Sequence, residues 1–185
     1  PLNPNIQTAF DIGTGSGVIA AILAKRGIPE ITATDTNPKA IACATANLAR
    51  LGLDKQVAVQ AVDLFPEGRA DLIVCNPPWL PAKPTSAVET ALYDPDNAML
   101  TAFLNGVRQH LNPQGEAWLI ISDLAEHLHL RDRDFLEQCF QTASLNVVGI
   151  LETKPRHRKA ADESDPLAFA RNRETTRLYR LEADR

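Results

Sequence analysis

The chain has 185 residues, of which 44% are apolar and 23% charged, and its formal net charge at pH 7 is -4. This composition is typical of one globular domain and excludes disordered, collagenous and coiled-coil chains, so we expect residues 1–185 to form a single domain. No apolar run approaches the roughly 20 residues of a membrane span, and no secretory leader is recognisable. We therefore expect a cytoplasmic protein with no membrane partner.

Charge is distributed unevenly along the chain. Residues 1–153 contain 10 Lys or Arg against 17 Asp or Glu, whereas residues 154–185 contain 9 against 6. Four of the six residues from Lys154 to Lys159 are basic, a density that could neutralise nucleic-acid phosphates. A solvated hairpin loop is the simpler explanation, because acidic residues follow this run at once.

Strand-like and helix-like segments alternate along most of the chain. Short β-branched or apolar runs predict strands at residues 8–12, 31–34, 56–62, 70–75 and 117–122, with a turn at residues 112–115. Apolar residues at helical spacing predict helices at residues 16–26, 38–51, 98–110 and 132–143. Two more strand-like runs follow at residues 146–154 and 175–182, with at most a short helix at residues 166–173 between them. This order predicts an α/β fold whose mostly parallel sheet is covered on both faces and closed at one edge by an antiparallel hairpin.

A glycine-rich turn follows the first predicted strand. From Asp11 to Gly17 the chain has the spacing DxGxGxG. The glycines let the backbone approach a ligand, and the following helix N-terminus offers N–H groups to a carboxylate or phosphate. A dinucleotide fingerprint would need glycine where Val18 stands, which disfavours a nicotinamide-dependent dehydrogenase.

Acidic residues end the first three predicted strands. Asp11 could attract a cationic amino group, Asp35 could accept hydrogen bonds from both hydroxyls of a ribose, and Asp63 is placed for the amino group of a base. Each could instead cap the next turn. Three at corresponding strand ends, one of them beside a triple-glycine turn, favour a ligand site.

The segments FDIGTGSG, ATDTNP and AVDLF together resemble the class I S-adenosylmethionine-dependent methyltransferases over nearly the whole chain. The resemblance implies a Rossmann-like seven-stranded mixed sheet of order 3-2-1-4-5-7-6, with strand 7 antiparallel and helices on both faces. It implies S-adenosyl-L-methionine as cofactor, with the methionine end along the glycines, the ribose on the second-strand acid and the adenine near the third. The residues implied to bind it are Asp11, Gly13, Thr14, Gly15, Gly17, Asp35, Thr36, Asp63, Leu64 and Asn76.

The fourth predicted strand is followed by NPPW, which resembles the (N/D/S)PP(Y/F/W) motif of amino-methyltransferases. That group includes adenine-N6 DNA, rRNA guanine-N2 and release-factor glutamine enzymes. The resemblance implies that Asn76, Pro77, Pro78 and Trp79 are catalytic. Oxygens of the first two can accept the N–H groups of an acceptor amine or amide, the prolines stiffen the turn, and the indole offers a stacking face. An ordinary proline turn with a core tryptophan is the alternative.

The long stretch after this motif carries 5 of the 13 prolines between residues 76 and 96 and no clear element, which is typical of a functional loop. Its second half resembles a segment of the release-factor glutamine enzymes. That resemblance makes Glu89, Tyr93 and Asp94 candidates for substrate contact. Helix capping by Asp96 or Asn97 explains the segment equally well.

We therefore expect an S-adenosylmethionine-dependent N-methyltransferase acting on a planar amino or amide nitrogen. Ribosomal RNA or another nucleic acid is the favoured partner, with a protein glutamine or a small molecule as alternatives. A cofactor-binding but inactive scaffold is the alternative from another class. The histidines and cysteines lack metal-ligand spacing, so no metal is expected, and Cys75 is interpreted as a buried strand residue rather than a nucleophile. Related methyltransferases usually carry an N-terminal helix or a substrate-recognition domain that this chain does not show.

Overall fold

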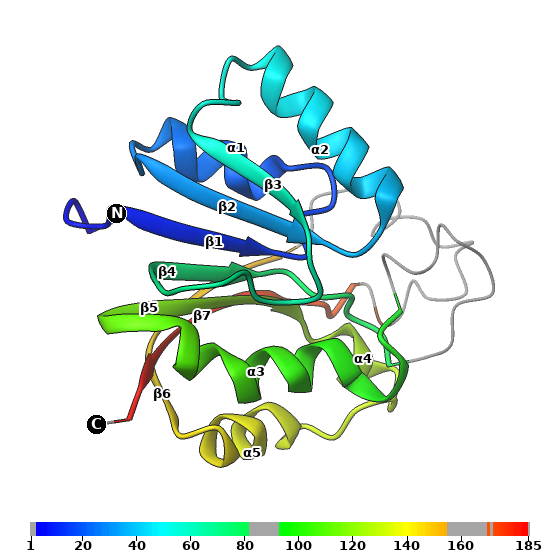
Figure 1. Ribbon diagram of the computed structural model, residues 1–185. Coiled ribbons are helices and arrows are strands. Elements are labelled where there is room, and N and C mark those ends of the chain that lie inside the picture. Colours follow the sequence, from blue (N-terminus) through cyan, green and yellow to red (C-terminus); the bar gives the residue numbers. More distant parts are fainter. Residues whose placement is uncertain (1–2, 82–92, 155–169, 171, 185) are drawn as a thin grey trace.

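Seven strands form one mixed sheet, shown in Figure 1, in the order β3-β2-β1-β4-β5-β7-β6. The computed structural model describes residues 3–81, 93–154, 170 and 172–184. Strands β1 to β5 are paired in parallel, whereas β7 runs antiparallel to both of its neighbours. The predicted fold class, strand order and direction of strand 7 are confirmed.

The elements fall within about three residues of most predicted bounds. The strands are β1 Thr8–Ile12, β2 Glu30–Asp35, β3 Val57–Ala61, β4 Ala70–Cys75, β5 Leu111–Ser122, β6 Leu145–Thr153 and β7 Thr176–Ala183. The helices are α1 Val18–Lys25, α2 Pro38–Arg50, α3 Ala98–His110, α4 Leu124–His127 and α5 Phe135–Thr142, with a short 3-10 turn η2 at Pro95–Asn97. The helix α4 was not predicted, because four residues are too short to show a helical period.

Helices cover both faces of the sheet, and strand alternation decides which side chain meets which helix. In β1, Ala9 packs into a cluster with α1 and α2, whereas Phe10 and Ile12 pack into a second cluster with α3 and α5. In β4, Leu72 and Val74 face the first cluster, and Ile73 and Cys75 face the second. This burial on both faces explains why these strands read as nearly continuous apolar runs.

Strand β5 begins six residues earlier than predicted. The turn-like residues 112–115 lie inside the strand, at an irregularity of the pairing between β4 and β5. Gln114 has a φ of +67°, and the Asn112 side chain donates to Asp71 with 2.8 Å between Nδ2 and Oδ1. A bulge therefore uses the same residue types as a turn, so the prediction of a turn here was wrong.

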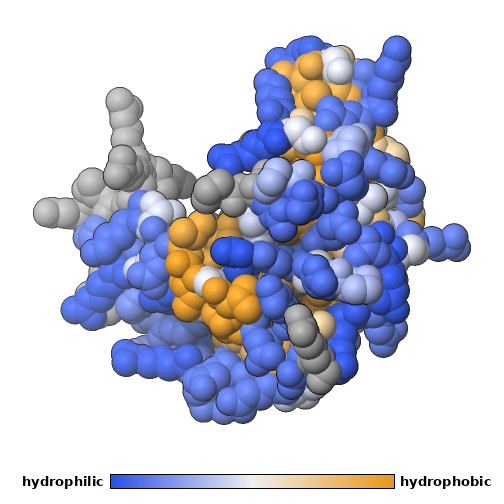
Figure 2. All heavy atoms as spheres, turned by 90° about the vertical axis from the view of Figure 1, so that its left-hand side faces the viewer, coloured by the Kyte–Doolittle hydropathy of each residue, from blue (hydrophilic) through white to orange (hydrophobic). Residues whose placement is uncertain are grey.

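Exposed apolar side chains gather on one face of the molecule, as Figure 2 shows. Strand β6 is an edge of the sheet and carries Val148 and Leu151, which are 44% and 63% exposed.

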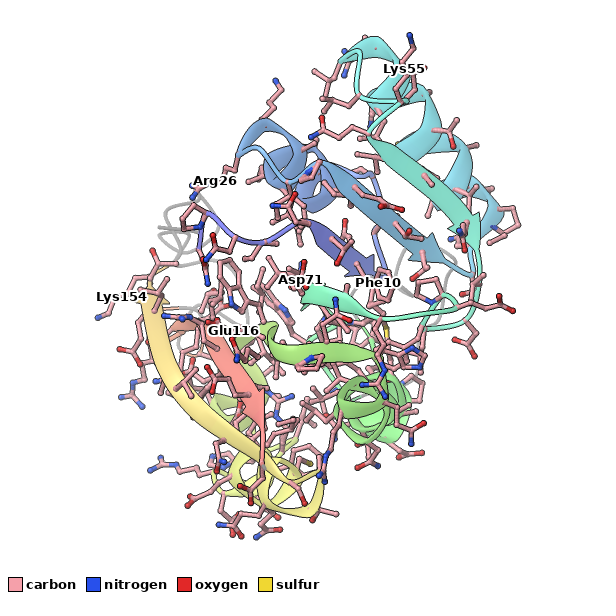
Figure 3. All side chains as sticks on the ribbon, turned by 60° about the vertical axis from the view of Figure 1, so that its left-hand side comes forward. Phe10, Arg26, Lys55, Asp71, Glu116 and Lys154 are labelled. Carbon is pink, nitrogen blue, oxygen red and sulfur yellow. The ribbon has the colours of Figure 1, made fainter. Side chains whose placement is uncertain are left out.

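Lys154, labelled in Figure 3, follows β6 and is the one member of the basic run among the described residues. Most of the predicted short helix at residues 166–173 also lies outside them. No helix in the described part of the chain is long and apolar enough to cross a membrane.

Candidate functional site

A cleft of about 410 Å³ opens where β1, β2, β3 and β4 end. In a parallel sheet this carboxyl edge is where ligands bind. Its lining includes eight of the predicted cofactor residues: Gly13, Thr14, Gly15, Asp35, Thr36, Asp63, Leu64 and Asn76. Of the other predicted site residues, Pro78 lines the cleft, whereas Asp11, Gly17, Pro77 and Trp79 do not. The segments predicted from four separate motifs thus meet in one cavity.

The glycine loop adopts backbone conformations that favour glycine. Gly13 has a φ of +68°, and a Cβ atom there would lie 2.6 Å from the Cε atom of Met99. Gly17 has a φ of +81°, and a Cβ atom there would lie 3.2 Å from the Cβ atom of Ala44 in α2. The first glycine therefore shapes the cleft, whereas Gly17 allows close packing between the loop and α2.

Asp35 connects the glycine loop to the start of α2. Its Oδ2 atom accepts a hydrogen bond from the Gly15 N–H at 2.9 Å, and its Oδ1 atom accepts one from the Asn37 N–H at 2.8 Å. Each carboxylate oxygen has a further lone pair, so the side chain can also accept hydrogen bonds from a diol in the cleft. Asp35 therefore both shapes the loop and presents acceptors to a ligand.

Asp11 lies near the end of β1 and supports the glycine loop from behind. The side chain is fully buried, and its Oδ2 atom accepts hydrogen bonds from the Thr14 hydroxyl at 2.6 Å and the Ala20 N–H at 2.9 Å. Its Oδ1 atom is buried without a hydrogen-bond partner, and burial raises the pKa of this carboxyl to about 6. The carboxylate lies behind the loop and does not line the cleft, and one of its oxygens has no partner among the described residues, so its contact with a ligand amino group stays a prediction.

The far side of the cleft is formed by the turn after β3. Leu64 has a φ of +56°, and its carbonyl oxygen accepts a hydrogen bond from the Thr34 hydroxyl at 2.6 Å. This bond ties the turn to β2 and holds Asp63, which is exposed, at the rim of the cleft. A carboxylate at this rim is accessible to an amino group of a bound base.

The NPPW turn places an exposed amide beside the cleft. Asn76 is exposed, Pro77 is buried, and Trp79 is half-buried and packs against the apolar cluster around α3. The Trp79 indole N–H donates to the Asn76 side chain, with 3.0 Å between Nε1 and Oδ1. Cys75 is completely buried, and burial raises the pKa of its thiol, which agrees with its interpretation as a strand residue.

The two ends of the long loop are held together. The Asp94 N–H donates to the Leu80 carbonyl at 2.8 Å, and a β-bridge joins Leu80 to Tyr93. The Asp94 carboxylate is buried and accepts hydrogen bonds from the N–H groups of Met99 and Leu100 at 2.8 and 3.0 Å. Asp94 therefore caps α3, and its predicted contact with a substrate stays a prediction.

The other candidates of this segment are also placed by the structure. Tyr93 forms the bridge and does not line the cleft, and Glu89 lies outside the described residues. Asp96 and Asn97, the predicted capping residues, have φ values of +56° and +54°. Asn97 is the N-cap of α3 but forms no capping bond through its side chain, and the Asp94 carboxylate accepts the N–H groups of the first turn instead. Sequence reasoning placed the cap two or three residues too late.

Several lining residues were missed by the sequence analysis. They are Ser16, Val18, Ile19, Asn37, Ala40, Val62 and Met99. Four of them, Val18, Ile19, Ala40 and Met99, are helix residues whose side of the helix could not be assigned from one sequence, and the other three lie in turns or loops. Met99 is the chain's single methionine and immediately follows the first residue of α3, which was a usable signal. Within the described residues, no group of His, Cys, Asp or Glu side chains is arranged to hold a metal ion.

The strand order and the glycine-loop cleft define a Rossmann-like methyltransferase fold. The chain belongs to the methyltransferase small domain family, whose model matches residues 2–148. This membership confirms the resemblance to methyltransferases that the motifs predicted.

Curated relatives and a solved structure show the same likeness. The chain is 36% identical to a release factor glutamine methyltransferase of Cereibacter sphaeroides, over 62% of this chain and 46% of that protein. It is 32% identical to a ribosomal RNA small subunit methyltransferase C of Erwinia tasmaniensis, over 72% of this chain and 37% of that protein. The chain thus spans less than half the length of either relative. A methyltransferase of Thiobacillus denitrificans solved with S-adenosyl-L-homocysteine superposes with a TM-score of 0.63 at 17% identity, over 96% of this chain and 85% of that one.

Proposed function

We propose that the chain is the catalytic domain of an S-adenosylmethionine-dependent N-methyltransferase that acts on a planar amino or amide nitrogen. The observation that carries the proposal is the single cleft joining the glycine loop, the acidic strand ends and Asn76. A cofactor-binding scaffold without activity would need only the first two of these features.

The lining of the cleft fits the proposed cofactor. Donors of the glycine loop and the N-terminus of α1 suit a carboxylate, Asp35 suits a ribose diol, and Asp63 suits an adenine amino group. When bound, S-adenosylmethionine supplies an electrophilic methyl group on a sulfonium whose departure leaves a neutral thioether. The chain's own contribution is to hold these groups so that the methyl group lies toward Asn76.

The acceptor chemistry follows from the oxygen atoms that the NPPW turn offers. The Oδ1 atom of Asn76 and the Pro77 carbonyl can each accept one N–H of the acceptor, which directs its lone pair toward the methyl group. With the cofactor bound, this turn would hold the acceptor nitrogen toward the methyl group, and the proton that the nitrogen gives up on transfer would pass to water. The turn therefore accelerates transfer by orienting a weak nucleophile rather than by removing a proton first.

The acceptor we place first is an exocyclic amino group of ribosomal or other RNA. Two observations support it: the basic run from Lys154 to Lys159, and the relative from Erwinia tasmaniensis that aligns with 72% of the chain. A protein glutamine is the second candidate, supported by the relative from Cereibacter sphaeroides, whose name states that substrate class. Both acceptors present a planar nitrogen with two N–H groups, so the same turn serves either.

The test is transfer of tritium from labelled S-adenosylmethionine into an unmethylated bacterial lysate that is then separated into RNA, DNA, protein and small molecules. Asn76→Ala is the control, because it removes the proposed acceptor contact. Label in RNA that the variant fails to transfer supports the proposal in its first form, and label in protein supports the glutamine form. Absence of label from every fraction, with S-adenosylhomocysteine still bound, contradicts the proposal and favours an inactive scaffold.

A further inference from the structure

We propose that Trp79 is a positioning residue whose indole N–H fixes the side-chain amide of Asn76 with its oxygen, rather than its NH2 group, committed to accepting hydrogen bonds beside the cleft. The inference rests on the proposed N-methyltransferase function and deepens it. It gives the tryptophan of this turn a second role, orientation of the Asn76 amide, beside stacking.

Asn76 needs an external restraint. It is exposed at the rim of the cleft, where an asparagine side chain is free to rotate about χ1 and χ2. Among the described residues, its side chain accepts a hydrogen bond from the Trp79 indole, with 3.0 Å between Nε1 and Oδ1. The orientation of the amide therefore depends on how firmly Trp79 is held.

Trp79 is held from several sides. Its side chain is half-buried and packs against the apolar cluster around α3. Pro77 and Pro78 restrict the backbone between the two partners. On the other side, the Leu80 carbonyl accepts a hydrogen bond from the Asp94 N–H at 2.8 Å, and Asp94 is fixed in turn as the cap of α3. The indole is thus anchored to the core, whereas the Asn76 side chain is exposed.

The indole N–H imposes one of the two orientations of the amide. A tryptophan Nε1–H donates and cannot accept, so a rotated amide would place its own NH2 donors against another donor. A phenylalanine at this position would give no preference, and a tyrosine hydroxyl can both donate and accept. The residue type at position 79 therefore decides which amide atom is presented beside the cleft.

This orientation selects the kind of acceptor. An amide oxygen has two lone pairs, of which the indole uses one, so Oδ1 can accept one further N–H. An acceptor nitrogen that carries N–H groups satisfies that lone pair. A carboxylate or carbonyl oxygen does not, because it has no hydrogen to donate. Trp79 therefore contributes, through Asn76, to the choice of nitrogen over such oxygen acceptors.

The first test compares Trp79→Phe with Trp118→Phe in the tritium-transfer assay. Trp118 is the chain's other tryptophan, and its Nε1–H also donates to a side chain, Glu116, at 2.8 Å. It lies on β5 and does not line the cleft, so it controls for loss of one indole hydrogen bond. We expect Trp79→Phe to lower kcat about tenfold with the KM for S-adenosylmethionine unchanged, and Trp118→Phe to change neither. An unchanged kcat in Trp79→Phe overturns the inference, and a raised kcat shows that the indole blocks Asn76.

The second test needs no methyl transfer, so it separates failure of this inference from failure of the proposed function. In protein labelled with 15N in tryptophan and asparagine, two indole N–H signals are expected, and each Trp→Phe variant assigns one of them. We expect Asn76→Ala to shift the Trp79 signal and speed its exchange with solvent while the Trp118 signal stays in place. We also expect Trp79→Phe to increase the motion of the Asn76 side-chain NH2 group. A Trp79 signal unaffected by Asn76→Ala, or an Asn76 amide equally ordered in both proteins, overturns the inference.

Discussion

The carboxylate of Asp11 accepts a 2.6 Å hydrogen bond from the hydroxyl of Thr14 from behind the glycine loop. Its second oxygen is buried without a partner, so the loop is supported by a charged group that the protein interior disfavours. Because protonation removes this charge, the stability that Asp11 contributes to the folded protein depends on pH.

This link predicts an unusual pH dependence of stability. Burial raises the pKa of Asp11 from 3.8 to about 6 in the folded protein. Between these values the folded state holds a proton that the unfolded state has lost, so the free energy of unfolding falls as pH rises from about 4 to 6. The full contribution is about 3 kcal/mol. Urea denaturation should measure the free energy of unfolding of the wild type and of Asp11→Asn at pH 4 and above pH 6. The difference between the two proteins should change by roughly this amount, with the wild type relatively more stable at pH 4.

Asp71, at the start of β4 in Figure 3, is the control with the opposite sign. Burial alone would raise the pKa of its carboxyl, but hydrogen bonds from Asn112, Gln7 and Thr8 outweigh burial and lower it. The stability that the Asp71 carboxylate contributes to the folded protein is therefore lost as pH falls. Asp71→Asn should lower the free energy of unfolding less at low pH than at neutral pH. If both variants shifted with pH in the same direction, the account of Asp11 would be wrong.

A second prediction concerns the close contact between Gly13 and Met99. Gly13→Ala should lower the free energy of unfolding and weaken binding of S-adenosylhomocysteine, because the new Cβ atom meets the methionine Cε atom. Gly52→Ala is a matched control, since Gly52 has the same φ of +68° but open space around its missing Cβ atom. It should show only the backbone strain, on the order of 1 kcal/mol.

The double variant separates collision from strain. Adding Met99→Ala to Gly13→Ala should recover most of the lost affinity, measured by isothermal titration calorimetry, because it removes the colliding atom. Recovery that is absent, or equal effects of Gly13→Ala and Gly52→Ala on stability, would show that the contact does not shape the cleft.

A third prediction concerns a buried arginine that joins three elements near the carboxyl edge of the sheet. The Arg131 side chain is 1% exposed, and its Nε atom pairs with the Glu126 carboxylate at 2.9 Å. Its guanidinium also donates to the Ser122 carbonyl at 3.0 Å and to the Asn97 Oδ1 atom at 3.4 Å. Arg131→Met should lower the free energy of unfolding by about 3 kcal/mol, because it leaves buried acceptors unpaired.

Arg180→Met is the comparison for Arg131→Met. Arg180 pairs with Glu116, labelled in Figure 3, but its side chain is 41% exposed, and water can replace the lost partner. Its loss should cost less than about 1 kcal/mol. If the two variants lowered the free energy of unfolding equally in urea denaturation, burial would not explain the stability that the Arg131 pair contributes.

The sequence predicted those features that local chemistry encodes. Alternating strand and helix patterns gave the elements, and motif resemblance gave the sheet order, because both depend on residue types at fixed spacing. The partners of buried polar groups were not predictable. The contacts of Asp11 with Ala20 and of Asp94 with Leu100 depend on which distant part of the chain packs beside each acid. The sequence around an acid at a strand end does not show whether its carboxylate faces a ligand or a backbone N–H. The bulge in β5 was missed for a similar reason, since bulges and turns use the same residues.

We propose that the cleft holds the nucleoside of S-adenosylmethionine on Asp35, and calorimetric titration with S-adenosylhomocysteine measures this contact. The wild type should bind one equivalent, and Asp35→Ala should weaken binding at least tenfold, about 1.4 kcal/mol or more, through loss of ribose and glycine-loop contacts. Asp54→Ala, at an exposed acid that does not line the cleft, should bind like the wild type. Equal affinity of Asp35→Ala and the wild type, or binding of NAD in place of S-adenosylhomocysteine, would contradict the account.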